Sequence, residues 1–265
     1  MRRRRGFFSS CASYSPTQCH GIFEHGYFCL NPANCSTDHE QFMPRFARIT
    51  LPNQPYLVCH ATSNSAGLFP LEGDHEVYLN MLHEACEACG LSLLAYALLP
   101  DRVYHLVSAG EIDCMAQAIG RAHMRYSLHV KRTTQRNGPA LWTGRFSSTM
   151  LEGSLVPDGA KFVERAAIHA GLESAPGEYR WSSAHARVEG EKDPFVESLG
   201  MKPGVWRKWI LEPLDAALLQ EFSKNLKTGR PTGSTAWLQK MEKQIGRSLV
   251  ARPRGRRPGK AKAQK

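Results

Sequence analysis

The sequence predicts an α+β fold in which helices cover an antiparallel β-sheet. Short runs rich in β-forming residues alternate with longer segments in which apolar residues recur at helical spacing. Their order is strand, helix, strand, strand, helix, strand, helix, which ferredoxin-like and RNA-recognition folds share. Two of the strand candidates, 91–99 and 103–107, are separated by Pro100-Asp101, and this dipeptide is typical of a β-hairpin turn.

The other elements are placed by their apolar spacing and by the residues that begin or end them. The first strand is expected at 56–62 and the first helix at 74–90, which ends on a glycine. Asp113 is a suitable N-cap for a second helix that runs to about Arg136 and ends at Asn137-Gly138-Pro139. A fourth strand is expected at 142–151, and a third helix at 158–170 is followed by Gly171.

The chain divides into four segments. Residues 1–42 have neither the period of 2 nor the period of 3.6 and are expected to be disordered, unless translation starts at Met43 and they are not part of the protein. Residues 43–202 hold the main domain. Residues 203–250 form a basic extension with two amphipathic helices, 211–226 and 235–249, the second opened by Ser234 or Thr235. Residues 251–265 are basic, contain Pro and Gly, and are expected to be a disordered tail.

The positive charge is concentrated at the C-terminal end. The chain has 34 Lys and Arg against 24 Asp and Glu, a formal net charge of +10. From Pro203 onward there are 15 Lys or Arg and four Asp or Glu, or +11, which leaves 19 minus 20, or −1, for the first 202 residues. Without the run from Arg2 to Arg5 this remainder is −5. A basic end on a nearly neutral body indicates an anionic partner held mainly by that end.

Apolar runs are shorter than the roughly 18 residues that a membrane helix needs, and Cys, His, Ser and Pro interrupt the N-terminal region. We therefore expect a soluble, cytoplasmic protein with no membrane partner. The eight cysteines show no repeated spacing, and because cytosolic thiols stay reduced, we expect no disulfides.

Four segments carry a family resemblance. In chain order they are Leu141-Trp142-Thr143-Gly144-Arg145-Phe146, Ala170-Gly171-Leu172, Tyr179-Arg180-Trp181-Ser182-Ser183, and Lys227-Thr228-Gly229-Arg230-Pro231-Thr232-Gly233-Ser234. In this order and spacing they resemble the REP-associated tyrosine transposases of the HUH single-strand transposase superfamily. The resemblance covers roughly Met43 to Lys265.

The resemblance implies a specific chemistry. Members of the family, as monomers or homodimers, bind a DNA hairpin next to single-stranded DNA. A tyrosine attacks a phosphate and leaves a 5′-phosphotyrosine. A Mg²⁺ or Mn²⁺ ion, held by a His-x-His pair on a strand, acts as a Lewis acid on the phosphate.

The metal-binding pair is replaced in this sequence. In the family the pair follows a Pro-Asn or Pro-Asp turn, and here Pro100-Asp101 is followed by Arg102-Val103-Tyr104-His105. The matching positions are Arg102 and Tyr104. His105 is one step out of phase, so on a strand its side chain faces the other side. A β-bulge at the turn would return His105 to the metal face with a single imidazole. We expect no resident cofactor, with His105 as the one candidate metal ligand.

The family nucleophile is also replaced. It lies in a Tyr-Ile-His-x-Asn-Pro segment that precedes an Ala-Gly-Leu. Counting back from Ala170-Gly171-Leu172 places Phe162 at the tyrosine, Glu164 at the histidine and Ala166-Ala167 at the Asn-Pro. A phenyl ring has no oxygen that can attack a phosphate, so no catalytic residue is intact. Tyr104 and Tyr126 are the other tyrosines considered, and each also fits as an ordinary packed aromatic residue.

Basic residues provide the candidate DNA contacts. Arg145 lies in the first family segment. Arg230 precedes Pro231 within 229–233, and a similar pattern recurs in 252–259 with the arginines Arg252, Arg254, Arg256 and Arg257. Both stretches resemble the Gly-Arg-Pro core of AT-hook-like arms, which lie extended and place Arg in a narrow minor groove. The alternative is a solvated tail that grips phosphates without sequence preference.

Two further patterns have a functional and an ordinary interpretation. Cys86 and Cys89, with His83 one turn earlier, have the spacing of half a zinc site, but two ligands are missing and they also fit as small residues on a helix face. Trp206 and Trp209 are the better candidates for stacking on bases, ahead of Trp181 and Trp237, although tryptophans are more often part of the core.

The sequence therefore predicts a DNA-binding protein of the transposase type that does not cleave DNA. The alternative is an active single-strand transposase that uses a displaced His105 and another tyrosine. A third hypothesis is a regulator whose DNA binding represses related elements.

Overall fold

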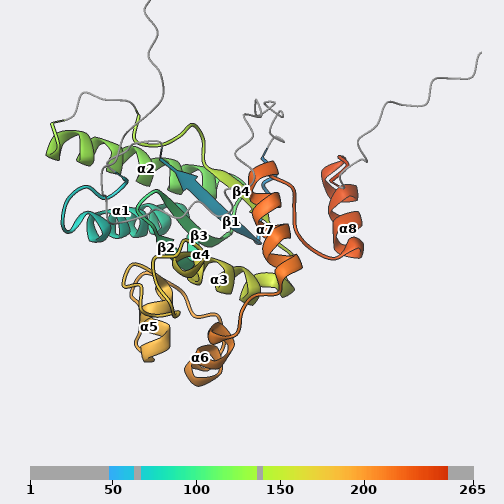
Figure 1. The fold of residues 1–265 in the computed structure, drawn as a ribbon. Coiled ribbons are helices and arrows are strands. Elements are labelled where there is room, and N and C mark those ends of the chain that lie inside the picture. The colour runs from blue at the N-terminus through green and yellow to red at the C-terminus, as the bar shows by residue number, and fades with distance from the viewer. Residues whose placement is uncertain (1–47, 63–66, 136–139, 250–265) are drawn as a thin grey trace, which may run out of the picture. The chain divides into compact units, whose positions relative to one another are not determined.

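The computed structural model describes residues 48–62, 67–135 and 140–249. Within them, four antiparallel strands form one sheet in the order β2-β3-β1-β4 (Figure 1). The strands are β1 (Gln54–Ala61), β2 (Leu91–Leu98), β3 (Arg102–Ala109) and β4 (Ser147–Met150). The predicted α+β class, with an antiparallel sheet covered by helices, is confirmed.

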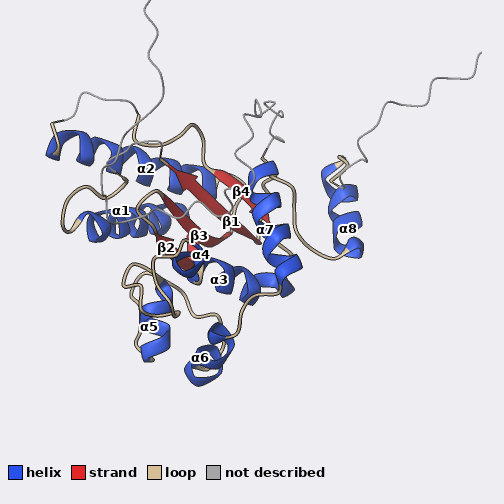
Figure 2. Ribbon diagram, in the orientation of Figure 1, coloured by secondary structure: helices blue, strands red, loops and turns tan. Residues whose placement is uncertain are grey.

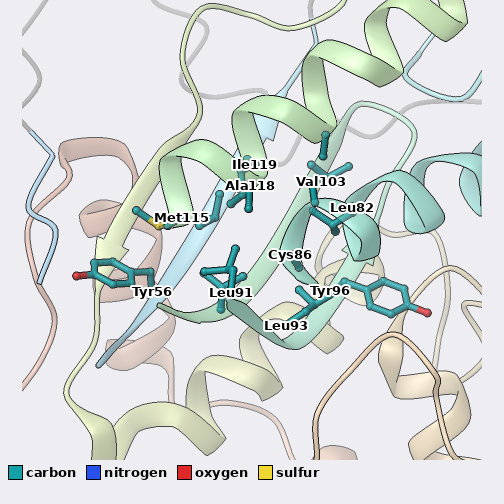
Figure 3. Close-up of a cluster of buried hydrophobic side chains, with 14 of the residues drawn as sticks. Tyr56, Leu82, Cys86, Leu91, Leu93, Tyr96, Val103, Met115, Ala118 and Ile119 are labelled. Carbon is teal, nitrogen blue, oxygen red and sulfur yellow. The ribbon is translucent and has the colours of Figure 1, made fainter. Parts of the chain in front are cut away.

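Helices α1 (Asp74–Cys89) and α2 (Cys114–Thr133) pack against each other and cover one face of the sheet (Figure 2). Figure 3 shows part of the core between them, where Tyr56 of β1 and Val103 of β3 lie with Leu82 of α1 and Met115 of α2. Both helices begin as predicted. α1 ends at Gly90, whose φ of 63° is the left-handed conformation that a glycine adopts most easily.

The other face of the sheet is covered by α3 (Val156–Glu164) and by helices of the C-terminal part. The single helix predicted at 158–170 is two helices, because Arg165 leaves the helical conformation before α4 (Ala166–His169). The break falls where two consecutive side chains bond to α6 (Pro203–Leu211): Glu164 accepts from Trp206, and Arg165 donates to the Ile210 carbonyl.

The C-terminal helices differ in part from the prediction. α5 (Ser183–Glu189) and α6 were not predicted, while α7 (Ala216–Thr228) and α8 (Thr235–Ile245) correspond to the two expected amphipathic helices. The Ser234 hydroxyl accepts a hydrogen bond from the Trp237 amide and caps α8. Five buried residues after Pro203 share one apolar cluster with the sheet: Trp206, Ile210, Leu214, Phe222 and Leu226.

Strand β4 is shorter than the predicted strand at 142–151. Trp142 turns into the core under α2, where its indole nitrogen donates to the His123 carbonyl at 3.1 Å. Thr143, Gly144 and Arg145 are exposed, and the Thr143 amide donates to the Ala61 carbonyl at the end of β1, so the regular strand begins only at Ser147. In the described ranges, no helix is both long and apolar enough to cross a bilayer.

One buried carboxylate joins three of the helices on the second face. Glu164 of α3 pairs with Arg187 of α5 and accepts hydrogen bonds from Ser183 Oγ at 2.7 Å and from Trp206 Nε1 of α6 at 2.9 Å. The Glu164 side chain is fully buried. A buried charge is tolerated only when its partners satisfy it, so this ion pair depends on all three donors.

We predict that Glu164→Gln lowers the free energy of unfolding by roughly 3 kcal/mol, because the Arg187 guanidinium then stays buried without a counter-charge. Urea unfolding followed by tryptophan fluorescence measures the change. The matched control is Glu189→Gln on the exposed side of α5, for which we expect a change of under about 0.5 kcal/mol. Equal effects of the two substitutions would contradict the role given to Glu164.

Candidate functional site

The register of β3 decides which side chains meet on the face that corresponds to the family's catalytic face. Residues of β1 and β3 pair without interruption from Gln54 opposite Ala109 to Ala61 opposite Arg102. The irregularity in the neighbouring ladder lies between Leu93 and Ala95 of β2. No residue is inserted in β3, so the bulge that would return His105 to the metal face is absent from it.

Tyr104 of β3 and Phe162 of α3 are in contact on the second face of the sheet. Their rings meet edge to face with centroids 5.8 Å apart, and Phe222 of α7 contacts the Phe162 ring at 5.5 Å. Phe162 is 6% exposed. The position of the family nucleophile is therefore a packed aromatic contact between α3, β3 and α7.

Burial raises the pKa of Tyr104 to about 12, against an opposing effect of the Arg102 charge. The Tyr104 hydroxyl therefore stays protonated at neutral pH. A protonated phenol is a poor nucleophile unless a base or a metal activates it.

Arg102 is already paired. Its guanidinium forms two hydrogen bonds to one carboxylate oxygen of Asp101, at 2.7 and 2.9 Å. This contact raises the pKa of Arg102 above its ordinary value. A guanidinium offers only donors, so Arg102 and Tyr104 do not replace two imidazoles around a divalent ion. The residues at the family's metal positions do not fit the metal.

Among the residues that the structure describes, no three His, Cys, Asp or Glu side chains are grouped so as to hold a metal. Of the half-site proposed on α1, His83 pairs with Glu87 at 3.4 Å, and Cys86 is buried in the core.

His105 points to the opposite face, as predicted, and takes part in a chain of hydrogen bonds under α1 and α2. His105 Nε2 lies 3.2 Å from the Tyr78 hydroxyl, which lies 2.9 Å from His123 Nε2. His123 Nδ1 lies 2.8 Å from His60 Nδ1, and His60 Nε2 lies 3.1 Å from the Gly144 carbonyl.

The Gly144 carbonyl sets the direction of this histidine chain when His60 is neutral, because a carbonyl only accepts. His60 must donate from Nε2, so its Nδ1 accepts from His123 Nδ1. His123 Nε2 then accepts from the Tyr78 hydroxyl, whose oxygen accepts from His105 Nε2. In this arrangement His105 Nδ1 keeps a buried lone pair that has no hydrogen-bond partner.

Burial lowers the pKa of His105 to about 3 and that of His123 well below its ordinary value, with a smaller contribution from neighbouring imidazoles. Trp142 covers the chain, stacking on His123 at 4.1 Å and on His60 at 4.6 Å. His60, Tyr78 and His123 were not among the residues predicted to be functional. Each is a polar residue at a position where the spacing of its strand or helix predicts an apolar, core-facing side chain, and this mismatch could have indicated a buried polar cluster.

Tyr126, the other tyrosine considered, is fully buried on the same side as His105, and its hydroxyl donates to the Leu68 carbonyl at 2.8 Å. This oxygen is in the core, on the face of the sheet opposite to Phe162.

The candidate DNA contacts fall into three groups. Arg145 lies beside β4 in a hollow that Arg48 and Lys227 also line. Arg230 donates to the Leu249 carbonyl at 2.9 Å. Arg252, Arg254, Arg256 and Arg257 lie outside the described residues.

The expectation of an extended arm at 229–233 is wrong. Thr232 is fully buried and pairs with Leu151 as a parallel bridge next to β4. Pro231 is also buried, and a Cβ at Gly233 would lie 2.5 Å from the Trp237 ring. This segment is part of the folded domain, so it cannot lie along a minor groove as an AT-hook-like arm does.

Three of the tryptophans predicted to stack on bases make contacts with other side chains of the folded domain. Trp206 is 2% exposed and bonds to Glu164, so its interpretation as a base platform is wrong. Trp209 carries the Lys161 ammonium over its ring at 4.0 Å. Trp181 stacks on His75 at 4.3 Å and is covered by Arg180 at 4.8 Å.

We predict that the protein loses stability as pH falls from about 6.5 toward 3. The unfolded chain binds protons at the ordinary histidine pKa of about 6.5, while folded His105 and His123 do not, so acid favours unfolding. Each contributes about 2 kcal/mol between pH 8 and pH 5. Urea unfolding at the two pH values measures the loss. Replacing the exposed His185 by Gln is the control, and equal stability at both pH values would refute neutral burial of these rings.

Comparisons with known proteins return structural similarity only. No family model and no curated protein matches the chain. One similar solved structure is a REP-associated tyrosine transposase bound to a REP hairpin, with 11% identity, a TM-score of 0.48, and coverage of 59% of this chain and 92% of the other. Another is a candidate transposase from Deinococcus radiodurans R1, with 19% identity, a TM-score of 0.32, and coverage of 49% and 99%. Likeness at this level assigns no activity.

Proposed function

We propose that this chain is a DNA-binding protein built on the scaffold of the REP-associated tyrosine transposases, and that it does not cleave DNA. The observation that carries the proposal is the contact between Tyr104 and Phe162. The two positions that hold the metal ligand and the nucleophile in the resembled family face each other here, but they offer a protonated phenol and a phenyl ring.

The proposal of DNA as the partner rests on three features. The four segments that resemble the family are present in order, and a basic C-terminal end follows the last of them. The excess positive charge lies after Pro203, where the resembled family has its own basic end. The folded domain adds a hollow lined by cations beside the edge strand β4. A hairpin with flanking single-stranded DNA is the substrate class that the resemblance implies.

The absence of cleavage rests on what each candidate nucleophile can reach. Phe162 has no attacking oxygen. Tyr126 has its hydroxyl in the core. Tyr104 has a hydroxyl on the appropriate face, but it is the ring that occupies one of the two metal positions, and His105 lies behind the sheet from it. In this fold, Tyr104, Tyr126 and His105 therefore do not bring a metal ion and a tyrosine oxygen to the same phosphate.

We predict that the protein forms no covalent adduct with a labelled hairpin that carries single-stranded flanks, in Mg²⁺ or in Mn²⁺. Denaturing gel electrophoresis after incubation measures this directly. A labelled adduct would contradict the proposal. If that adduct disappeared in Tyr104→Phe, Tyr104 would be the nucleophile and the protein an active transposase. If it disappeared in Tyr126→Phe, the core would have to open for catalysis.

We predict that removal of residues 251–265 weakens DNA binding and flattens its salt dependence. The segment contains seven Lys or Arg. If each contacts one phosphate of a single strand, the slope of log affinity against log salt decreases by about 5, at about 0.7 per contact. Fluorescence anisotropy at several salt concentrations gives the slope. A full-length variant in which the seven Lys and Arg of residues 251–265 are replaced by Gly or Ser is the length control. If removal of the segment left the slope unchanged, the tail would not contact phosphates.

A further inference from the structure

A hollow beside β4 brings together cations from three separate parts of the chain. Arg48 precedes β1, Arg145 precedes β4, and Lys227 lies in the last turn of α7. The hollow is shallow, with a volume of about 40 Å³, and it is open to solvent. Ser147 and Ser148 of the edge strand β4 also line the hollow. No carboxylate is among the lining residues.

Arg48 is held in a fixed orientation. Its guanidinium lies 3.8 Å from the centre of the Phe146 ring, and Nη2 donates to the Phe146 carbonyl at 3.1 Å. Within the described residues Arg48 forms no ion pair, and neither does Lys227. Because one nitrogen of the Arg48 guanidinium is held by the Phe146 carbonyl, its other N–H groups keep a fixed direction and can donate to an oxyanion.

The two arginines repel each other. Burial lowers the pKa of Arg48, and the Arg145 charge lowers it further. Like charges held together in a half-buried site cost stability, which a bound anion recovers. Arg145 is positioned by the histidine chain, since His60 bonds to the carbonyl of the preceding residue, Gly144.

The hollow adjoins the face on which Tyr104 and Phe162 meet. Ser147 pairs with Cys59 of β1, and Cys59 pairs with Tyr104 of β3, so the three side chains form one row on one face. Two strand spacings separate Ser147 from Tyr104, or about 10 Å.

We propose that this hollow binds a phosphodiester group of single-stranded DNA through Arg48, Arg145 and Lys227. The proposal rests on the proposed function, since it names the strand-binding site of the same protein. The folded domain then supplies specific phosphate contacts of its own, apart from those of the C-terminal tail.

The test is the affinity of the full chain for a labelled single-stranded oligonucleotide, measured by anisotropy over a range of salt concentrations. The double variant Arg145→Gln with Lys227→Gln removes two contacts. We expect its salt slope to decrease by about 1.4 and its affinity at 0.1 M salt to fall about 25-fold. Arg121→Gln, an exposed cation on α2 across the sheet, is the matched control and leaves both unchanged.

The outcomes separate the two proposals. If the unsubstituted protein binds no DNA, the proposed function fails. If it binds DNA and the double variant keeps its slope, only the hollow is wrongly assigned. Lys227→Arg preserves the charge and should preserve the slope, which distinguishes lost contacts from lost folding. Binding of inorganic phosphate that the double variant loses, with DNA affinity unchanged, would assign the hollow to a free anion and overturn the proposal.

Discussion

The alternation of side chains along β3 is the constraint on which the rest of the structure depends. Consecutive residues of a strand face opposite sides, so Tyr104 and His105 cannot serve the same site. His105 is further held by Tyr78 in a buried chain that continues through His123 and His60 to Gly144. To return His105 to the other face, the register of β3 would have to shift and every apolar side chain of the strand would change sides.

The opposite face has become a packed interior. Phe162 lies between Tyr104 and Phe222. Glu164, two residues further along α3, forms an ion pair with Arg187 and accepts a hydrogen bond from Trp206. Both residues stand where the resembled family has groups that act on DNA, and both now join helices to one another.

Much of the fold could be predicted from the sequence, since the strands and the first two helices follow clear apolar periods. The opposite orientation of His105 followed from its phase alone. The features that could not be predicted depend on tertiary contacts. α6 begins at Pro203 and buries Trp206, which the local pattern of Lys and Arg had suggested was exposed. Likewise, the burial of Thr232 beside Leu151 joins residues about 80 positions apart.

The sequence alone showed which residues of the resembled family's site are missing. It did not show which contacts the substituted residues make. Counting from Ala170-Gly171-Leu172 located Phe162, but nothing local indicated that Phe222 would cover it. Arg145 was identified as a DNA contact without its neighbours, because Arg48 and Lys227 approach it from segments about 80 to 100 residues away.

The central claim is that β3 presents Tyr104 and not His105 to the face of Phe162, and nuclear magnetic resonance of the histidine rings tests it most directly. The structure predicts that His105 is neutral at pH 7 with its proton on Nε2, and that an excess of paramagnetic Mn²⁺ leaves its ring signals unbroadened. Selective broadening of the His105 signals by Mn²⁺ would place that imidazole on a metal-binding face and contradict the account.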